Sequence, residues 1–182
     1  MTRLKIIEWP HPTLETRAEE VTLFDDAFKA FVQDMHETMR AKGGIGLAAN
    51  QVNVLKRVTV IEIPYMEPEE ASEDHEPRKE WHDKTFTFVN PRIIHREGKQ
   101  KYLEGCLSFP ELFEWVERAD KITVEAEDEN GVTFRVDADG TFSVCLQHEI
   151  DHLDGIVFFK RMSRLKAQII KKKMQKRHLV RG

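Results

Sequence analysis

The segment FSVCLQHEIDHLDG, residues 142–155, decides how this chain is organised. Its apolar positions recur at helical spacing and Asp154-Gly155 supplies a stop, so the segment predicts a helix over residues 142–153. One apolar stripe of this helix can pack into the core, and it consists of Leu146, Ile150 and Leu153. A face about 100° away carries side chains capable of chemistry. These are Cys145, His148, Glu149 and His152.

The polar face matches the pattern H-E-x-x-H, in which two histidines four residues apart can reach one cation. His148 and His152 take the histidine positions and Glu149 takes the glutamate position. Buried without a partner, each of these groups would carry a desolvation cost, and a metal ion removes that cost. The alternative interpretation is a pair of solvated histidines beside a carboxylate. We favour a metal centre of the hydrolase type, with Glu149 as the acid/base.

A catalytic centre of this type needs a third protein ligand and one open position. Cys106 lies in the segment Glu104-Gly105-Cys106-Leu107-Ser108, where glycine allows close backbone approach and a thiolate is a strong soft ligand. Cys145 is the other candidate, but it lies one turn before His148 on the same helix, where completing a tetrahedron is difficult. We therefore choose Cys106 as the ligand and expect Cys145 to be a small buried residue that faces the site.

A third unusual segment, GIGLAANQ, spans residues 44–51. Its small residues let the backbone approach a ligand closely, and it lacks the third glycine and the strand-helix-strand setting of a nucleotide-binding fingerprint. We expect a tight loop that presents the Gln51 amide to a reaction centre.

Composition limits the remaining choices. The 182 residues suit one globular domain, and a net charge of -4 excludes a polycation that coats DNA or RNA over its whole surface. No segment has the length of apolar sequence that spans a membrane, and the N-terminal segment lacks the apolar core of a secretory signal. Two cysteines are too few for a disulfide framework. We expect a cytoplasmic protein without a membrane or DNA partner.

The rest of the chain predicts an α+β fold, with antiparallel β-sheets around the central metal-binding helix, in a single domain over 1–182. Helical periodicity predicts an N-terminal helix over 25–41 and a basic C-terminal helix over 163–178. Strands are predicted over 58–63 and 86–89, the second ending at Pro91. A hairpin is predicted from 122–126 to 132–136 around Asn130-Gly131. The acidic stretch 67–83 is expected to be an exposed loop insertion.

Taken together, the three segments GIGLAANQ, EGCLS and QHEIDH, in this order, strongly resemble those of peptide deformylases. The resemblance spans nearly the whole chain. It implies removal of the formyl group from the N-terminal formyl-methionine of nascent polypeptides, with release of formate. It also implies one divalent ion per chain bound by Cys106, His148 and His152, with Fe²⁺ as the ion in the cell and Zn²⁺, Ni²⁺ or Co²⁺ as alternatives.

The same resemblance assigns the remaining roles. Glu149 becomes the catalytic acid/base, and Gln51 with the Leu107 backbone N–H contacts the substrate oxyanion. The methionine side chain is expected in an apolar pocket, and the residues expected to contact the substrate are Ile45, Gly46, Tyr102, Glu104, Gly105, Val144 and Cys145. Some relatives carry an arginine near Phe113 that helps to seat the peptide, and this chain has none there.

The C-terminal helix predicts a further partner. Ten Lys and Arg residues fall between Lys160 and Arg181 with no acidic residue among them, so this helix could contact ribosomal RNA, or it could be a solvated face. Two other functions compete with deformylation. A zinc peptidase would need a third ligand downstream, where only His178 is available. A ribosome-associated module with a structural metal would not need Glu149 and Gln51.

Overall fold

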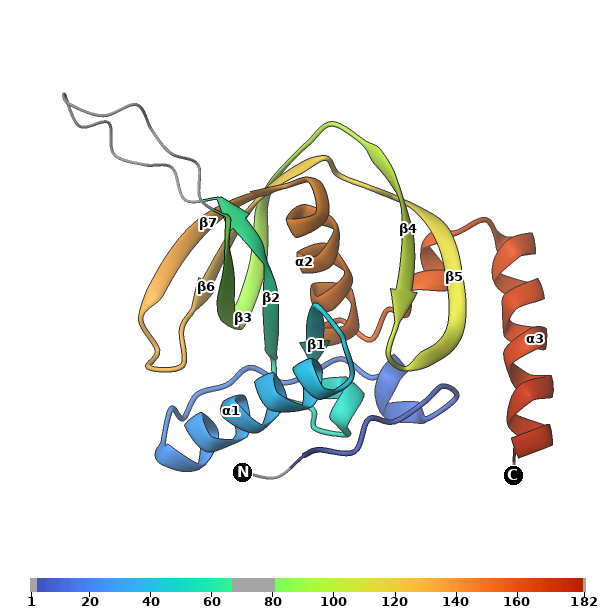
Figure 1. Cartoon of the computed structure of the whole chain (residues 1–182), viewed down its shortest axis with the longest axis horizontal. Coiled ribbons are helices and arrows are strands. Elements are labelled where there is room, and N and C mark those ends of the chain that lie inside the picture. The colour runs from blue at the N-terminus through green and yellow to red at the C-terminus, as the bar shows by residue number, and fades with distance from the viewer. Residues whose placement is uncertain (1–2, 67–80, 182) are drawn as a thin grey trace.

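The computed structural model describes residues 3–66 and 81–181, and in these ranges two antiparallel sheets flank one buried helix (Figure 1). The first sheet has the order β1-β2-β3-β6-β7, and the second is the pair β4-β5. The strands are β1 (Gly46–Ala48), β2 (Val58–Met66), β3 (Trp81–Glu97), β4 (Gln100–Cys106), β5 (Phe109–Arg118), β6 (Lys121–Glu127) and β7 (Thr133–Asp139). The predicted α+β class with antiparallel sheets is confirmed.

Helix α2 (Gly140–Leu153) lies between the two sheets, with β4 and β5 on one side and the larger sheet on the other (Figure 1). Every residue from 142 to 153 is buried, including the polar ones. The apolar stripe packs as expected, because Leu146 and Leu153 have no exposed surface and Ile150 is 5% exposed. The helix is therefore enclosed, and its polar face lies inside the protein.

Helix α1 (Asp26–Ala41) packs its apolar face against β1 and β2 and confirms the predicted N-terminal helix. The Asp25 carboxylate accepts a hydrogen bond of 2.8 Å from the backbone N–H of Phe28, which caps the helix. The buried face of α1 consists of Phe28, Val32, Met35, His36, Thr38 and Met39. This packing fixes the segment that follows the helix, which leads into β1.

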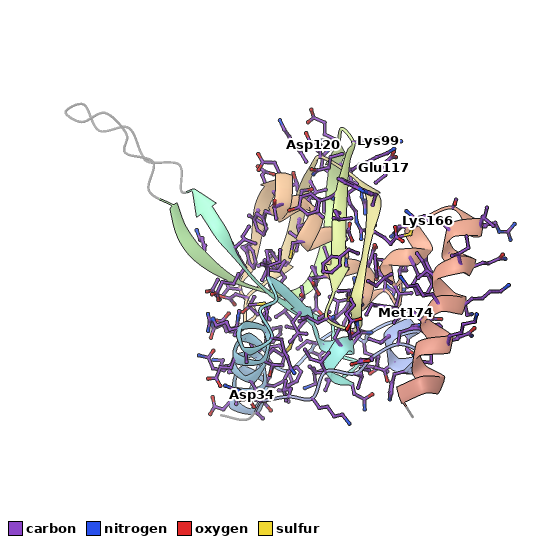
Figure 2. The ribbon with its side chains drawn as sticks, turned by 45° about the vertical axis from the view of Figure 1, so that its right-hand side comes forward. Asp34, Lys99, Glu117, Asp120, Lys166 and Met174 are labelled. Carbon is purple, nitrogen blue, oxygen red and sulfur yellow. The ribbon has the colours of Figure 1, made fainter. Side chains whose placement is uncertain are left out.

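The C-terminal helix α3 (Arg164–Arg181) lies outside β5, at the edge of the molecule (Figure 1). Met174 is buried against the apolar cluster around Phe109 and Phe158, and Figure 2 shows it on the side of α3 that faces the protein. Lys166 forms an ion pair of 2.6 Å with Glu114 of β5. The predicted basic helix is confirmed, and it extends to Arg181. No helix in the described ranges has the length and apolar content needed to cross a membrane.

Three short 3₁₀-helices complete the connections. They are η1 (Pro12–Glu15), η2 (Ala49–Val52) and η3 (Phe158–Arg161). The predicted loop over 44–51 is wrong in part, because Gly46–Ala48 pair with Thr59–Ile61 as strand β1 before η2 begins. A short apolar run is enough to fill an edge position when a neighbouring strand offers free backbone groups.

Strand β3 corrects two other expectations. It does not end at Pro91 but continues to Glu97, because the register shifts between Val89 and Arg92 and Asn90 takes a φ of 51°. Such a bulge tolerates proline, which cannot donate to the ladder. The predicted loop 67–83 is also too long at its C-terminal end, since Trp81 and the next two residues pair with the end of β2. Residues 67–80 lie outside the described ranges.

The hairpin of β6 and β7 agrees with the prediction, since Val124 lies opposite Val136 across the Asn130-Gly131 turn. The hairpin of β4 and β5, by contrast, was not predicted. Its strands carry apolar side chains on both faces, for example Tyr102 inward and Trp115 outward, and this obscures the period of two. The missed hairpin is the element that carries Cys106.

Candidate metal centre and substrate pocket

The three predicted metal ligands converge. Sγ of Cys106, at the end of β4, lies 3.2 Å from Nε2 of His152, and this Nε2 lies 3.2 Å from Nε2 of His148. All three donor atoms lie within 4.8 Å of one another. Both histidines are buried in α2, and Cys106 is half-buried. Three donors at this spacing fit a single ion with one coordination position left open.

The donor set indicates which class of ion fits. One thiolate and two imidazoles suit Fe²⁺, Co²⁺, Ni²⁺ or Zn²⁺, whereas Mg²⁺ and Ca²⁺ prefer oxygen ligands. Nδ1 of His148 lies 2.7 Å from Oε2 of Glu104, which leaves Nε2 of this ring for the ion. Nδ1 of His152 is buried and has no hydrogen-bond partner in the described part of the chain.

The path of β4 explains why Cys106 reaches α2. Gly105 pairs opposite Phe113, but Cys106 pairs opposite Phe109, so the register shifts between the two residues. Such an irregularity changes the direction of the side chain that follows it, here that of Cys106 at the end of the strand. Sγ of Cys106 consequently lies beside the two histidines.

A chain of charged side chains, buried except for Arg161 at its outer end, leads to the side of the His148 ring that faces away from the other metal donors. Arg118 donates two hydrogen bonds to Glu104, of 2.7 and 3.0 Å, and a third to Asp151. Arg161 also donates two hydrogen bonds to Asp151, one from Nε to Oδ2 and one from Nη2 to Oδ1. The order of contacts is therefore Arg161, Asp151, Arg118, Glu104 and His148.

These contacts shift the pKa values of the residues that make them. Burial would raise the pKa of Glu104, but hydrogen bonds from Arg118 and His148 lower it to about 2. Burial disfavours the charge of Arg118, yet its bonds to Glu104 and Asp151 raise its pKa. Glu104 is therefore ionised at neutral pH and holds the His148 ring in one orientation.

Glu149 lies on the same face of α2, beside the three donors. It is 4% exposed, and its Oε2 has no hydrogen-bond partner in the described part of the chain. Burial raises the pKa of Glu149 to about 7, against the opposing charge of His148. A carboxyl group with this pKa can both accept and donate a proton at neutral pH.

A hydrogen bond to its amide oxygen fixes the orientation of the Gln51 side chain. Its Oε1 accepts a hydrogen bond of 2.9 Å from the Ala48 backbone N–H, so its Nε2 points toward Cys106 and Ser108 at 3.5 and 3.3 Å. The N-terminal segment fixes this arrangement, because the N–H of Ile7 donates to the Gln51 carbonyl and that of Trp9 to the Ser108 carbonyl. The amide N–H group thus faces the metal donors.

A pocket of about 700 Å³ opens beside these groups. It is lined by twelve of the thirteen predicted site residues: Ile45, Gly46, Gln51, Tyr102, Glu104, Gly105, Cys106, Leu107, Val144, Cys145, His148 and Glu149. The exception is His152, which lies behind the pocket and is 1% exposed. The three sequence motifs therefore meet at one cavity.

Gly46 and Cys145 form the inner wall of this pocket. A Cβ atom on Gly46 would lie 2.5 Å from Oε1 of Glu149 and 2.9 Å from Sγ of Cys145, so only glycine leaves room for both. Sγ of Cys145 lies 3.7 Å from the Ile45 carbonyl oxygen. Burial, together with the charge of Glu149, raises the pKa of the Cys145 thiol, which disfavours a thiolate.

Sequence reasoning missed Arg118, Asp151 and Arg161. Asp151 lies inside the H-E-x-x-H motif, and a charged residue in a buried helix was a signal that it needs a partner. The sequence offers no comparable signal for Arg118, which lies at the end of an amphipathic strand among other charged residues.

Comparison with known proteins agrees with this geometry. The family described as polypeptide deformylase matches residues 3–168. The peptide deformylase of Chromobacterium violaceum is 41% identical over 177 residues, which cover 97% of each chain. That of Acidobacterium capsulatum is 42% identical over 171 residues, covering 94% of this chain and 93% of the relative.

Solved structures of peptide deformylases are also similar to this chain. Peptide deformylase from Ehrlichia chaffeensis in complex with actinonin superposes with a TM-score of 0.83 at 38% identity, covering 97% of this chain and 98% of that one. The enzyme from Thermus thermophilus superposes with a TM-score of 0.82 at 35% identity, covering 99% of this chain and 97% of that one.

Proposed function

Because this chain belongs to the polypeptide deformylase family, we propose that Cys106, His148 and His152 hold the metal ion with which it removes N-terminal formyl groups. The chain is a metal-dependent hydrolase that acts on formylated peptides and releases formate. One observation carries the residue assignment: three donor atoms converge within 4.8 Å at the pocket that contains Glu149.

We propose Fe²⁺ as the ion in the cell, with Zn²⁺, Ni²⁺ or Co²⁺ as ions that the same donors can bind. The thiolate of Cys106 and the two imidazoles support this set. When bound, such an ion lowers the pKa of water to about 7 and polarises the formyl oxygen.

Glu149 is the proposed acid/base. Its carboxylate takes a proton from the water that attacks the formyl carbon, and it returns this proton to the amine nitrogen when the C–N bond breaks. The products are formate and a free N-terminus. The pKa of about 7 and the free Oε2 of Glu149 support both proton transfers.

Stabilisation of the oxyanion formed in the attack requires hydrogen-bond donors that are already in position before the reaction. We assign this role to Nε2 of Gln51 and to the backbone N–H of Leu107. The hydrogen bond from Ala48 N–H to Oε1 of Gln51 keeps the amide nitrogen directed at the site. A donor of this kind contributes about 3 kcal/mol to transition-state stabilisation.

For Glu104 we propose a positioning role in addition to the substrate contact expected from the sequence. Both of its carboxylate oxygens are bonded, one to Arg118 and the other to Arg118 and His148. We propose that Glu104 orients His148, and that the surfaces of Ile45 and Val144 remain for the methionine side chain. A narrow space beside Gly46 admits the formyl group and excludes acetyl.

The test is formate release. Protein loaded anaerobically with Fe²⁺ is given formyl-Met-Ala-Ser, and Glu149→Ala is the matched variant. The wild type should release formate, and Glu149→Ala should lose at least ~100-fold in rate while it retains the metal. Absence of formate release from the wild type would refute the function. Loss of metal from Glu149→Ala would refute the role of this residue.

Domain organisation and location are also proposals. We propose that 1–182 form one catalytic domain in the cytoplasm, and the match of the family over residues 3–168 supports the single domain. Limited proteolysis should leave one large resistant fragment, and cell fractionation should place the protein with soluble enzymes. Two resistant fragments or a membrane fraction would contradict these proposals.

We further propose that α3 contacts ribosomal RNA. Of the ten basic residues between 160 and 181, Lys160, Arg161 and Lys166 already pair with acidic side chains of the protein. The exposed lysines that remain in the described part of α3 are Lys171, Lys172, Lys173 and Lys176. Replacing these four with glutamate should abolish cosedimentation with ribosomes, and unchanged cosedimentation would refute the contact.

A further inference from the structure

The two oxyanion donors assigned above lie on separate elements of the chain. Gln51 belongs to η2, whereas Leu107 lies between β4 and β5, directly before Ser108. Nε2 of Gln51 donates a hydrogen bond of 3.3 Å to Oγ of Ser108. Because an amide nitrogen carries two hydrogens, this bond leaves the other one for the oxyanion. The relative position of the two elements therefore decides whether both donors reach one oxygen atom.

One N-terminal segment, residues 7–16, contacts both elements, and we call it the strap. The N–H of Ile7 donates a hydrogen bond of 2.8 Å to the carbonyl of Gln51, and the N–H of Trp9 donates one of 3.0 Å to the carbonyl of Ser108. Figure 1 shows this segment, in dark blue, passing η2 and reaching the end of the β4-β5 hairpin. A short piece of backbone thus ties the elements of the two donors together.

The later part of the strap holds η2 a second time. Nδ2 of Asn50 donates hydrogen bonds of 3.3 and 2.7 Å to the carbonyl oxygens of Thr13 and Thr16. Asn50 has no exposed surface and directly precedes Gln51 in η2. The strap therefore fixes the backbone of Gln51 and the side chain of the residue before it.

Trp9 anchors the strap to the rest of the protein. It is 4% exposed, and its ring stacks on Phe109 and meets Phe159 edge-on, with ring centroids 6.3 and 5.8 Å apart. Its indole N–H donates a hydrogen bond of 3.0 Å to Glu15. Phe109 directly follows Ser108, so the ring and the backbone N–H of Trp9 hold the same turn. Trp9 is not among the residues that line the pocket.

We propose that Trp9 is a positioning residue for the reaction, and that through the strap it keeps Gln51 and Leu107 where both donate to one oxyanion. This role rests on the proposed deformylation at the same site. Such donors act only if they are in place before the charge develops, and a misplacement of about 1 Å can cost about 100-fold in rate. The strap holds none of the three metal donors, so disturbing it should lower kcat without releasing the ion.

The test measures kcat and KM for formyl-Met-Ala-Ser with protein loaded anaerobically with Fe²⁺. Trp9→Ala should lower kcat by about 10- to 100-fold, with bound metal unchanged and KM altered by less than about threefold. Trp9→Phe keeps an aromatic ring on Phe109 and should restore most of the rate. Met174→Ala is the matched control, because it removes a buried side chain of the same apolar cluster from α3. It should lower the urea midpoint of unfolding and keep wild-type kcat.

Two further measurements show how Trp9 acts. If it acts through the donors, Trp9→Ala should cost less in a Gln51→Ala background than in the wild type. An ester bond between residues 8 and 9 replaces the Trp9 N–H by oxygen, keeps the whole side chain and removes only the hydrogen bond to Ser108. This ester protein should lose up to about tenfold in kcat, the most that one neutral hydrogen bond contributes.

The possible failures are distinguishable. No formate from the wild type would refute deformylation itself. With an active wild type, unchanged kcat in the ester protein would overturn the positioning role, and this result decides the matter even if Trp9→Ala does not fold. An equal loss of kcat in Met174→Ala would also overturn it, as would a loss of metal that accounts for the lower rate. Losses from Trp9→Ala and Gln51→Ala that simply multiply would show that Trp9 does not act through Gln51, and would overturn the proposal as well.

Discussion

Replacing Arg118 with methionine should destabilise the protein and weaken metal binding together. The Arg118 side chain is 4% exposed and stands between Glu104 and Asp151, whose side chains are 4% and 8% exposed. Methionine has a similar length and no charge, so the substitution removes the guanidinium without leaving a large cavity. Glu104 keeps its contact with His148, and Asp151 keeps Arg161.

The expected loss follows from the pKa of Glu104. Its fall from 4.5 to about 2 corresponds to about 3 kcal/mol of preference for the ionised form, which Arg118 and His148 share. Removing one partner of a buried ion pair costs about 3 to 5 kcal/mol. For a chain of this length, that loss lowers the melting temperature by about 6 to 20 °C. Loosening the support of a ligating histidine weakens metal affinity by about 10- to 100-fold.

The assay combines urea unfolding of the chelated protein, followed by far-UV circular dichroism, with a Co²⁺ titration against a competing chelator. Arg135→Met is the matched control, because Arg135 forms an ion pair with Glu125 on the surface and is 68% exposed. Equal unfolding midpoints for the two variants would refute the stabilising role of the buried pair. Unchanged Co²⁺ affinity in Arg118→Met would refute the positioning of His148 through Glu104.

Three other changes test separate parts of the structure. Cys106→Ser should reduce bound metal, whereas Cys145→Ser should retain it, and the reverse pattern in metal analysis would exchange their roles. Gly46→Ala should lower kcat by at least ~100-fold, because the added Cβ would displace the Glu149 carboxylate, and wild-type kcat would contradict this packing. Buried His36 has a pKa lowered to about 4, first by burial and then by Arg40. Because the unfolded chain takes up this proton first, stability should fall by up to about 3 kcal/mol as pH drops from 6.5 to 4. His36→Gln should remove that part of the pH dependence in urea unfolding, and an unchanged pH profile would contradict it.

Sequence reasoning found the elements whose apolar residues recur with a single regular period. Helix α1 has a single apolar face and an Asp25 cap, and β6 and β7 alternate regularly around Asn130-Gly131. The strands β4 and β5 were missed because Leu103, Phe113 and Trp115 are exposed on the face away from the core, where polar side chains were expected. The continuation of β3 past Pro91 depends on a bulge whose formation is decided by the partner strand.

By itself, the sequence determined the chemistry that this chain can perform. The spacing of His148 and His152 follows from the geometry of one helix, and Glu149 lies beside them for the same local reason. Only the tertiary structure decided which third ligand joins these groups and which charged side chains hold them in position. Sγ of Cys106 reaches the histidines because the register of β4 and β5 shifts before it, and Arg118 joins Glu104 to Asp151 across separate elements. Such contacts join residues far apart in the chain, so packing rather than local spacing sets them.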